Sequence, residues 1–321
     1  MIQHNDHDRI AIIGAGHVGS TAAYALMLRA LVREIVLIDS DIGLAEAEAI
    51  DISDANALAR PARIWAGDYA DAATARLAII TAGAATHGSE SRLSVAGRSA
   101  KIVGDCVDAL IAQGFDGILI IASNPVDVMA HLAFSRSGLS SKRVIGIGTL
   151  LDSSRLQQAL ASRLNVAPGA IEAVVVGEHG DSEVAAFSTV RIGGVPLDRF
   201  APNEVENYKK VADDVRTAGY RIIEGKGYTS FGVATAIVRI CEAILRDEHS
   251  IVPVSTLLTG EFGLSDIYLS LPCVLGAGGV DRALLPELNL DEIAHLRASG
   301  EKIALALAEL KLTGNRSGGV G

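Results

Sequence analysis

Short apolar runs alternate with longer amphipathic stretches over the first half of the chain. Five runs rich in β-branched residues occupy positions 10–13, 35–38, 77–81, 118–121 and 144–147. Their apolarity is continuous rather than alternating, which is typical of strands buried on both faces of a parallel sheet. The stretches between them, at 18–31, 43–58, 93–113 and 126–135, predict helices. This alternation predicts an α/β domain with a doubly wound parallel sheet over residues 1–149.

The pattern changes at about residue 150. A helix predicted over 153–164 is followed by strand-like runs at 171–176 and 184–192, with a turn at Gly193 and Gly194. Further helices are predicted over 204–224 and 231–246, strands over 250–257 and 265–275, and a last helix over 290–312. These elements predict a mixed α+β second domain over residues 150–321.

Composition and charge narrow the function classes. Of the 321 residues, 49% are hydrophobic and 21% charged, which is a globular composition. The chain carries 28 basic and 38 acidic residues and no cluster of Lys and Arg, so nucleic acid and anionic membranes are not expected as partners. An anionic ligand must therefore be bound by individually placed cations or by backbone amides.

Cysteines and the N-terminus indicate the compartment. Cys106, Cys241 and Cys273 are odd in number and far apart, which fits a reducing compartment and argues against a disulfide framework or a zinc site, so no metal is expected. The first ten residues are polar, and no apolar run reaches a membrane-spanning length. The sequence thus predicts a cytoplasmic protein.

A glycine-rich segment, GAGHVG at 14–19, follows the first predicted strand and opens a helix. Gly14 would permit a tight turn, Gly16 the approach of a pyrophosphate, and Gly19 close packing of helix on strand. Asp39 ends the second apolar run, where its carboxylate would bind ribose hydroxyls and repel a 2′-phosphate. A glycine-rich turn with an incidental acid is the alternative, but strand, helix and spaced acid together predict NAD binding.

Two further positions follow predicted strands. Gly83 comes after the run 77–81 and Asn124 after the run 118–121, at the sheet edge where ligands of open α/β sheets bind. Asn124 could instead cap the next helix, with Pro125 at the first helical position.

Three side chains suit the binding of an organic acid and proton transfer to it. His179 lies in GEHGD at 177–181, where small flanking residues suggest close approach by a ligand; a turn histidine is the alternative. Asp152 and Arg155 are three apart, so they can share a helix face. Asp152 could orient an imidazolium while Arg155 binds a carboxylate, or Asp152 could cap the helix and leave Arg155 in solvent.

Arg92 ends the polar segment GSESR at 88–92, ahead of a long predicted helix. Such a segment could close over a bound ligand, carry the arginine inward and exclude water. The alternative is a capping loop with an exposed arginine.

Taken together, these residues resemble the L-lactate/malate dehydrogenase family, and its lactate branch more than its malate branch. The resemblance runs from residue 10 to about residue 312, through blocks at 14–19, 35–39, 81–84, 90–93, 122–127, 148–155, 177–181 and 225–229. It implies an NAD-binding Rossmann domain, a substrate-binding second domain and a homotetramer or at least a dimer.

The resemblance also implies roles for individual residues. His179 would transfer the proton, Asp152 would orient His179, and Arg92 would polarise the C2 oxygen. Arg155 would bind the substrate carboxylate in a pocket shared with Thr86, Asn124 and Thr229. The implied cofactor contacts are Gly14, Gly16, Val18, Gly19, Asp39, Tyr69, Gly83, Ala84, Ala122 and Asn124.

The sequence departs from the family pattern in places that bear on substrate and regulation. Thr86 stands where lactate enzymes commonly carry Gln and malate enzymes Arg, so it offers no charge to a second carboxylate. Glu90 is lactate-like and further disfavours a dianion. Gln157 and Glu172 replace the basic pair with which some relatives bind fructose 1,6-bisphosphate, so that activation is not expected.

The expected function is therefore an NAD-dependent L-2-hydroxy acid dehydrogenase acting on lactate and pyruvate, or on a larger monocarboxylic 2-oxo acid. Malate dehydrogenase is one alternative. A catalytically silent NAD-binding redox sensor is another, but it would not need His179, Asp152, Arg92 and Arg155 together. A glycosidase-like redox enzyme would usually add a metal, for which the sequence shows no Cys/His cluster at ligand spacing.

Overall fold

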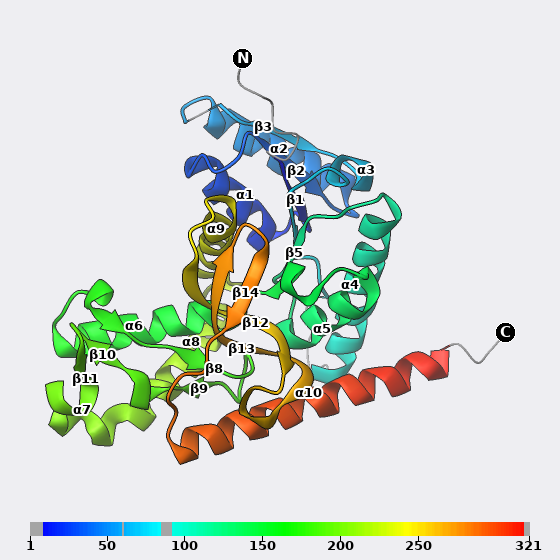
Figure 1. Ribbon diagram of the computed structural model, residues 1–321. Coiled ribbons are helices and arrows are strands. Elements are labelled where there is room, and N and C mark those ends of the chain that lie inside the picture. Colours follow the sequence, from blue (N-terminus) through cyan, green and yellow to red (C-terminus); the bar gives the residue numbers. More distant parts are fainter. Residues whose placement is uncertain (1–8, 60, 85–91, 318–321) are drawn as a thin grey trace. The chain divides into compact units, whose positions relative to one another are not determined.

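The computed structural model describes residues 9–59, 61–84 and 92–317 (Figure 1). Contacts divide the chain into two compact units. The first comprises Met1–Ile147, Thr229–Ser250 and Leu275–Asp281; the second comprises Gly148–Tyr228, Ile251–Val274 and Arg282–Gly321. The second half of the chain therefore contributes segments to both units.

Six parallel strands form the sheet of the first unit, in the order β6-β5-β4-β1-β2-β3. They are β1 (Arg9–Ile13), β2 (Glu34–Ile38), β3 (Arg63–Ala66), β4 (Leu77–Ile80), β5 (Ile118–Ile121) and β6 (Val144–Gly146). The strand order reverses between β1 and β4, and open sheets of this kind bind ligands at the carboxyl ends beside such a reversal. The predicted doubly wound α/β fold is confirmed.

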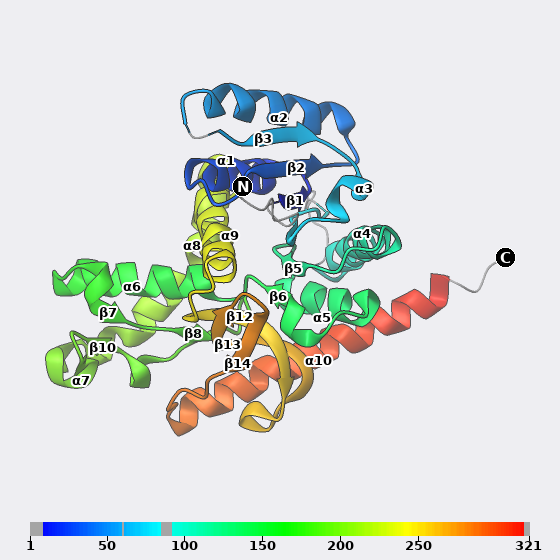
Figure 2. The same cartoon turned by 45° about the horizontal axis from the view of Figure 1, so that its top comes forward.

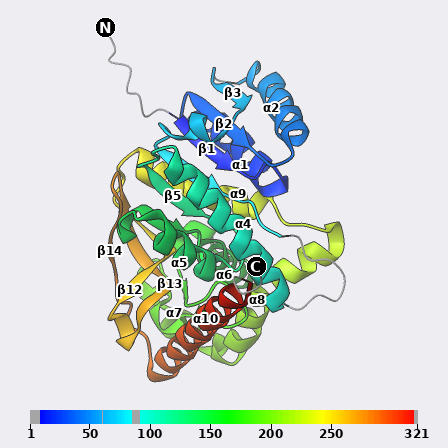
Figure 3. The ribbon, with the colours of Figure 1, turned by 90° about the vertical axis from the view of Figure 1, so that its right-hand side faces the viewer.

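Helices connect these strands. They are α1 (His17–Leu28), α2 (Ile42–Asn56), α3 (Tyr69–Ala72), α4 (Arg92–Ala112) and α5 (Val126–Ser137), with a 3₁₀ turn η1 (Ser141–Arg143) before β6. From β1 the strand order runs in one direction to β3, and from β4 it runs in the other direction to β6. Because both sets of crossovers are right-handed, α1 and α2 lie on one face of the sheet and α4 and α5 on the other. Within this unit α4 packs along α5 (Figure 3).

Another helix of the first unit comes from late in the sequence. This helix, α9 (Phe231–Leu245), packs along α1 (Figure 2). Arg29 Nη1, at the end of α1, lies 3.3 Å from Oε1 of the buried Glu242 on α9. The low charge content of both helices thus reflects in part their packing on one another.

The sequence pattern missed β3, and its position explains why. As the edge strand it has only one neighbour, and among its residues only Ile64 is buried. The ring of Trp65 lies under two guanidinium groups, with Arg9 Cζ 5.1 Å and Arg63 Cζ 4.3 Å from its centroid. Arginines supply part of this packing, so no apolar run marks the strand.

The second unit is a mixture of helices and strands, as predicted. Its helices are α6 (Leu150–Leu164), α7 (Leu197–Phe200), α8 (Tyr208–Lys226) and α10 (Leu290–Ser317). The 3₁₀ turns are η2 (Pro168–Ala170), η3 (Phe187–Thr189), η4 (Pro202–Asn207) and η5 (Glu261–Gly263). The strands are β7 (Ile171–Glu172), β8 (Val175–Val176), β9 (Val184–Ala185), β10 (Arg191–Ile192), β11 (Val195–Pro196), β12 (Ser250–Thr259) and β13 (Ser265–Gly276), and β14 (Gly279–Ala283) follows β13.

Two predicted strands of this unit were wrong in extent, and the helices predicted over 153–164, 204–224 and 290–312 are observed at Leu150–Leu164, Tyr208–Lys226 and Leu290–Ser317. The runs 171–176 and 184–192 are not continuous strands, because each divides between two small sheets: β7 pairs with β10, while β8 pairs with β9. The helix predicted from 204 begins at Tyr208, after the 3₁₀ turn η4. The turn at Gly193 and Gly194 is confirmed, with φ of 54° and 82° between β10 and β11.

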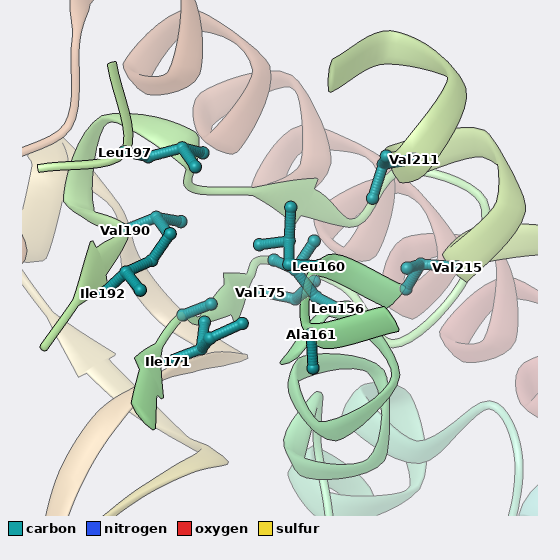
Figure 4. Packing of buried hydrophobic residues seen from close by; sticks show 11 residues of the cluster. Leu156, Leu160, Ala161, Ile171, Val175, Val190, Ile192, Leu197, Val211 and Val215 are labelled. Atoms are coloured by element: carbon teal, nitrogen blue, oxygen red, sulfur yellow. The ribbon is translucent and has the colours of Figure 1, made fainter. Parts of the chain in front are cut away.

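The core of the second unit lies between α6, α8 and the small sheets. Side chains from these elements converge in Figure 4, where Leu156 and Leu160 of α6 face Val175 and the helix α8 contributes Val211 and Val215. This packing fixes α6, whose first two turns carry Asp152 and Arg155. In the described part of the chain, no helix has the length and apolarity needed to span a membrane.

Candidate active site

The glycine-rich loop at 14–19 joins β1 to α1, and its own packing requires two of its three glycines. Gly14 has φ of +104°, and a Cβ there would lie 2.6 Å from the backbone nitrogen of Ala82. A Cβ on Gly19 would lie 1.8 Å from the carbonyl oxygen of Gly14. The Thr81 hydroxyl donates to this same oxygen at 2.7 Å. Loop, helix and the end of β4 are therefore in direct contact.

Gly16 has no such packing reason. A Cβ there would meet no described atom within 4 Å, and its φ of −67° suits any residue. Gly16 is also the N-cap residue of α1, where no side chain accepts a hydrogen bond from the first amides. Open space in front of uncapped helix amides suits an anionic group that approaches the backbone closely. The loop therefore fits the pyrophosphate of a dinucleotide.

Asp39 lies beside this loop. Its Oδ2 accepts a hydrogen bond from the backbone N–H of Ala15 at 2.7 Å, and its Oδ1 accepts one from the N–H of Asp41 at 2.9 Å. These bonds hold the carboxylate, half-buried, at the end of β2. From there it could accept bonds from ribose hydroxyls, and its charge would oppose a 2′-phosphate.

The other predicted cofactor residues also belong to the first unit. Val18 lies in the first turn of α1, and Gly83 and Ala84 follow β4, where the Ala84 N–H donates to Ser99 Oγ at 3.2 Å. Tyr69 begins α3; burial, a hydrogen bond to Cys106 and nearby acidic groups raise the pKa of its phenol. Ala122 follows β5 and is half-buried.

The interpretation of Asn124 as a helix cap is wrong. The N-cap residue of α5 is Pro125, the helix begins at Val126, and no side chain caps it. Asn124 is exposed, which leaves its amide available to a ligand. Ser123 was not among the predicted site residues. Its hydroxyl donates to the carbonyl of Ala82 at 2.5 Å and joins the ends of β4 and β5.

The contrast between Gly16 and Gly19 gives a matched pair of predictions. Gly19→Ala is expected to lower the free energy of unfolding by about 1–3 kcal/mol, because the methyl group has no room. Gly16→Ala is expected to leave the melting temperature nearly unchanged and to raise the Kd for NADH about tenfold or more. Thermal unfolding and NADH fluorescence titration measure both. A Gly16→Ala protein that binds NADH normally would contradict the assignment of this loop.

Asp152, Arg155 and His179 lie together in the second unit. The side chain of Asp152 is only 2% exposed. Its Oδ2 lies 2.6 Å from His179 Nδ1, and its Oδ1 accepts a hydrogen bond from Arg155 Nη1 at 2.9 Å. Thr149, not Asp152, is the N-cap residue of α6. The capping interpretation of Asp152 is therefore wrong, and Arg155, with 19% of its side chain exposed, is not a solvated surface charge.

The electrostatics of Asp152 favour its ionised form. Burial by itself would raise the pKa of this carboxyl group, but the adjacent His179 and Arg155 outweigh burial and hold the pKa below its ordinary value. An ionised carboxylate only accepts hydrogen bonds, so His179 must present Nδ1–H to it. In this tautomer Nε2 is the ring nitrogen that can exchange a proton with a substrate oxygen.

Glu183 is a member of this cluster that the sequence did not reveal. It follows the turn that contains His179 and precedes β9, with its N–H donating to Gly180 O at 3.2 Å. Burial, followed by the charge of Asp152, raises the pKa of Glu183 to about 8, against the smaller opposing effects of His179, Arg155 and Arg216. A glutamate directly before a valine carries no local signal of such burial.

The raised pKa of Glu183 makes stability depend on pH. Between pH 4.5, the ordinary pKa of a glutamate, and about pH 8, Glu183 keeps its proton in the folded chain but has lost it in the unfolded chain. The free energy of unfolding must fall as pH rises through this window. Glu183→Gln is expected to remove this loss, so the variant should gain melting temperature over the wild type progressively up to about pH 8. Glu172→Gln, at an exposed site of the same unit, is the control. A difference independent of pH would contradict the raised pKa.

Three predicted site residues belong to the first unit by their position in the chain. Thr86 lies outside the described residues, and Arg92 is described only through its backbone, as the first residue of α4. Thr229 precedes α9 in the first unit and is half-buried. Their roles stay predictions.

Comparison with known proteins agrees with both units. The NAD binding domain of lactate/malate dehydrogenases matches residues 8–146, and the alpha/beta C-terminal domain of the same enzymes matches residues 149–312. The chain is 39% identical over 308 residues to an L-lactate dehydrogenase of Clostridium botulinum (strain Loch Maree / Type A3), covering 94% of this chain and 97% of that protein. It is 42% identical over 307 residues to the L-lactate dehydrogenase of Thermus aquaticus, covering 94% and 99%.

A solved structure has the same fold. The minor L-lactate dehydrogenase from Enterococcus mundtii in its ligand-bound form superimposes with a TM-score of 0.92 at 35% identity, covering 95% of this chain and 98% of that one. Fold, domain order and sequence identity thus agree over nearly the whole chain, which belongs to the lactate/malate dehydrogenase family and uses NAD as its cofactor.

Proposed function

We propose that this protein is an NAD-dependent L-lactate dehydrogenase that interconverts L-lactate and pyruvate. One observation carries the proposal: Asp152 binds His179 through one carboxylate oxygen and Arg155 through the other, which places a proton carrier and a carboxylate-binding cation side by side. A 2-hydroxy acid needs both groups on adjacent carbons, one at the C2 oxygen and one at the C1 carboxylate. The similarity to L-lactate dehydrogenases supports this substrate.

In this proposal His179 moves the proton. During pyruvate reduction, protonated His179 donates from Nε2 to the C2 oxygen; during lactate oxidation, neutral His179 accepts the hydroxyl proton. The negative charge of Asp152 stabilises the imidazolium form and fixes the ring through Nδ1. NAD, when bound, supplies or takes the hydride.

Arg155 holds the substrate. One of its nitrogens bonds Asp152 at 2.9 Å, and the guanidinium retains further N–H groups that can bind a carboxylate with two parallel bonds. Arg92 would polarise the C2 carbonyl, and Asn124 and Thr229 would complete the pocket. These assignments rest on the family resemblance.

In the first domain, which we propose to extend over residues 1–149, the cofactor residues divide between two ends of the ligand. Gly14, Gly16, Val18 and Gly19 would hold the pyrophosphate, and Asp39 and Tyr69 the adenosine end. Gly83 and Ala84 would lie along the ligand, with Ala122 and Asn124 toward the nicotinamide. The open space at Gly16 and the fixed carboxylate of Asp39 support this arrangement.

The substrate and cofactor preferences provide the test. Thr86 is uncharged and Glu90 acidic, so a second carboxylate would be unpaired in a closed site, at a cost of several kcal/mol. We expect kcat/KM for pyruvate, or a larger monocarboxylic 2-oxo acid, to exceed that for oxaloacetate by at least about tenfold, and NADH to be preferred to NADPH. Steady-state assays over a panel of 2-oxo acids measure both ratios.

The same panel distinguishes the other outcomes. A higher kcat/KM for oxaloacetate than for pyruvate at alkaline pH would indicate a malate dehydrogenase. Cofactor binding without turnover of any 2-oxo acid would indicate a redox sensor. Thr86→Arg should move the preference toward oxaloacetate by supplying a cation. Retention of the pyruvate preference in that variant would remove Thr86 from the substrate pocket.

We also propose a homotetramer in the cytoplasm, with residues 150–321 forming the substrate-binding domain. Tyr24 and Leu28 on α1 and Phe231 on α9 remain 43%, 52% and 71% exposed in the single chain, although both helices also pack on one another. Exposed apolar side chains on adjacent helices suit a contact between copies. Light scattering at micromolar concentration distinguishes a tetramer from a monomer.

A further inference from the structure

A buried hydroxyl from α10 holds the turn that carries His179. Ser299 is fully buried, and its Oγ accepts a hydrogen bond from the backbone N–H of Glu178 at 2.8 Å. Glu178 immediately precedes His179 in the chain. The preceding residue, Gly177, has φ of +94°, and a Cβ there would lie only 3.0 Å from Ser299 Oγ. Helix and turn are therefore in close contact at this point.

Ser299 belongs to a closed ring of hydrogen bonds. Its Oγ lies 3.1 Å from Ser182 Oγ, and the Ser182 hydroxyl also bonds the carboxylate of Glu178. Each hydroxyl has one proton, and a carboxylate only accepts. Ser182 therefore donates to Glu178, Ser299 donates to Ser182, and the N–H of Glu178 donates to Ser299. The ring uses every donor and clamps both ends of the turn, Glu178 and Ser182, on either side of His179.

The surroundings of Ser299 show that the hydroxyl does not serve helix packing. The buried face of α10 includes Leu296, which is fully buried, and Ile303, which is 2% exposed. Ser299 lies between them on this face. Alanine would fill nearly the same space, favour the helix more and bring no polar atom that must be satisfied. The hydroxyl is accounted for by its bonds to the turn.

The rest of the turn is held by other elements of the second unit. The backbone N–H and C=O of Gly177 pair with Ser270 of β13 at 3.0 Å each, and Asp181 Oδ1 accepts from the hydroxyl of Tyr220 at 2.8 Å. His179 itself is bonded to Asp152 of α6. Ser299, by accepting the hydrogen bond from the N–H of Glu178, holds the backbone directly before the histidine.

We propose that Ser299 is a positioning residue for proton transfer: through the ring with Glu178 and Ser182, α10 fixes the place of the His179 imidazole. This inference rests on the proposed lactate dehydrogenase reaction. Proton transfer depends on sub-ångström placement of donor and acceptor, so loosening this turn should slow the chemical step. Arg155 lies outside the ring, so substrate binding should change little.

Ser299→Ala tests the proposal. We expect kcat to fall about tenfold while KM for pyruvate stays within about twofold, the pattern of an interaction needed only in the transition state. The primary deuterium isotope effect on oxidation of 2-deuterated L-lactate should rise, because chemistry becomes more rate-limiting. A purely structural role of Ser299 would lower the melting temperature without changing the isotope effect.

Ser270→Ala is the matched control. Ser270 is an equally buried serine whose backbone also contacts Gly177, but its hydroxyl has no hydrogen-bond partner within the described residues. Its removal should leave kcat within about twofold of wild type. Equal losses in the two variants, or an unchanged kcat and isotope effect in Ser299→Ala, would overturn the proposal.

Ser182→Ala breaks the same ring from a less buried position and carries the test if Ser299→Ala does not fold. Its loss of kcat should match that of Ser299→Ala, and the double variant should lose no more than either single variant, because all three lack one ring. Additive losses would contradict a shared ring. Absence of turnover in the wild-type protein, measured in the same assay, would instead contradict the proposed function and remove the basis of this inference.

Discussion

His179→Gln is expected to lower kcat for pyruvate reduction by about 10²–10⁴-fold, the usual contribution of a positioned general acid. Glutamine retains a polar group of similar reach, but it cannot donate a proton and recover it near neutral pH. NADH affinity should remain within a few-fold, because the predicted cofactor residues belong to the first unit and His179 to the second. Steady-state kinetics and fluorescence titration of NADH measure the two effects separately.

His295→Gln is the control, since His295 is exposed on α10. It should change neither kcat nor NADH binding. Near-normal turnover in His179→Gln would remove this histidine from the mechanism, whereas a parallel loss of NADH binding would show that the substitution had disturbed more than proton transfer.

Much of the fold could be predicted from the sequence, because strands buried on both faces must be apolar throughout. All five predicted strands of the first unit, β1, β2, β4, β5 and β6, agree with the structure to within one residue at either end. The edge strand β3 gave no such signal, because an edge strand is only partly covered and Arg63 and Trp65 pack it instead. In the second unit, each of two predicted strands divides between sheets, a tertiary feature that no local pattern records.

The candidate site divides in the same way. His179, with glycine next to it, and Asp152, three residues before Arg155, carry local signals of function, and the structure places the three side chains in contact. Glu183 and Ser299 carry none. Glu183 owes its raised pKa mainly to burial produced by the fold, and Ser299 reaches the turn from a helix 121 residues farther along the chain than Glu178. Such residues can be found only from the packed structure.

Asp152→Asn is expected to lower kcat/KM for pyruvate reduction by about 10²-fold or more near neutral pH. The substitution keeps the size of the side chain but removes the charge that both His179 and Arg155 contact. In the proposed mechanism protonated His179 donates the proton to pyruvate, and loss of an adjacent buried carboxylate destabilises the protonated form. The amide can also donate toward Nδ1, which would favour the wrong tautomer.

The pH dependence separates charge from geometry. If Asp152 acts through its charge, the alkaline limb of kcat/KM for pyruvate should move to lower pH in Asp152→Asn, and the loss should be larger at about pH 8 than at about pH 6, where more of the histidine is protonated. Asp181→Asn is the control, because Asp181 lies two residues from His179 but bonds Tyr220 on the surface. A loss of the same size at every pH would mean that Asp152 acts only by orienting the ring. A rise in KM for pyruvate without a fall in kcat would mean that its main partner is Arg155.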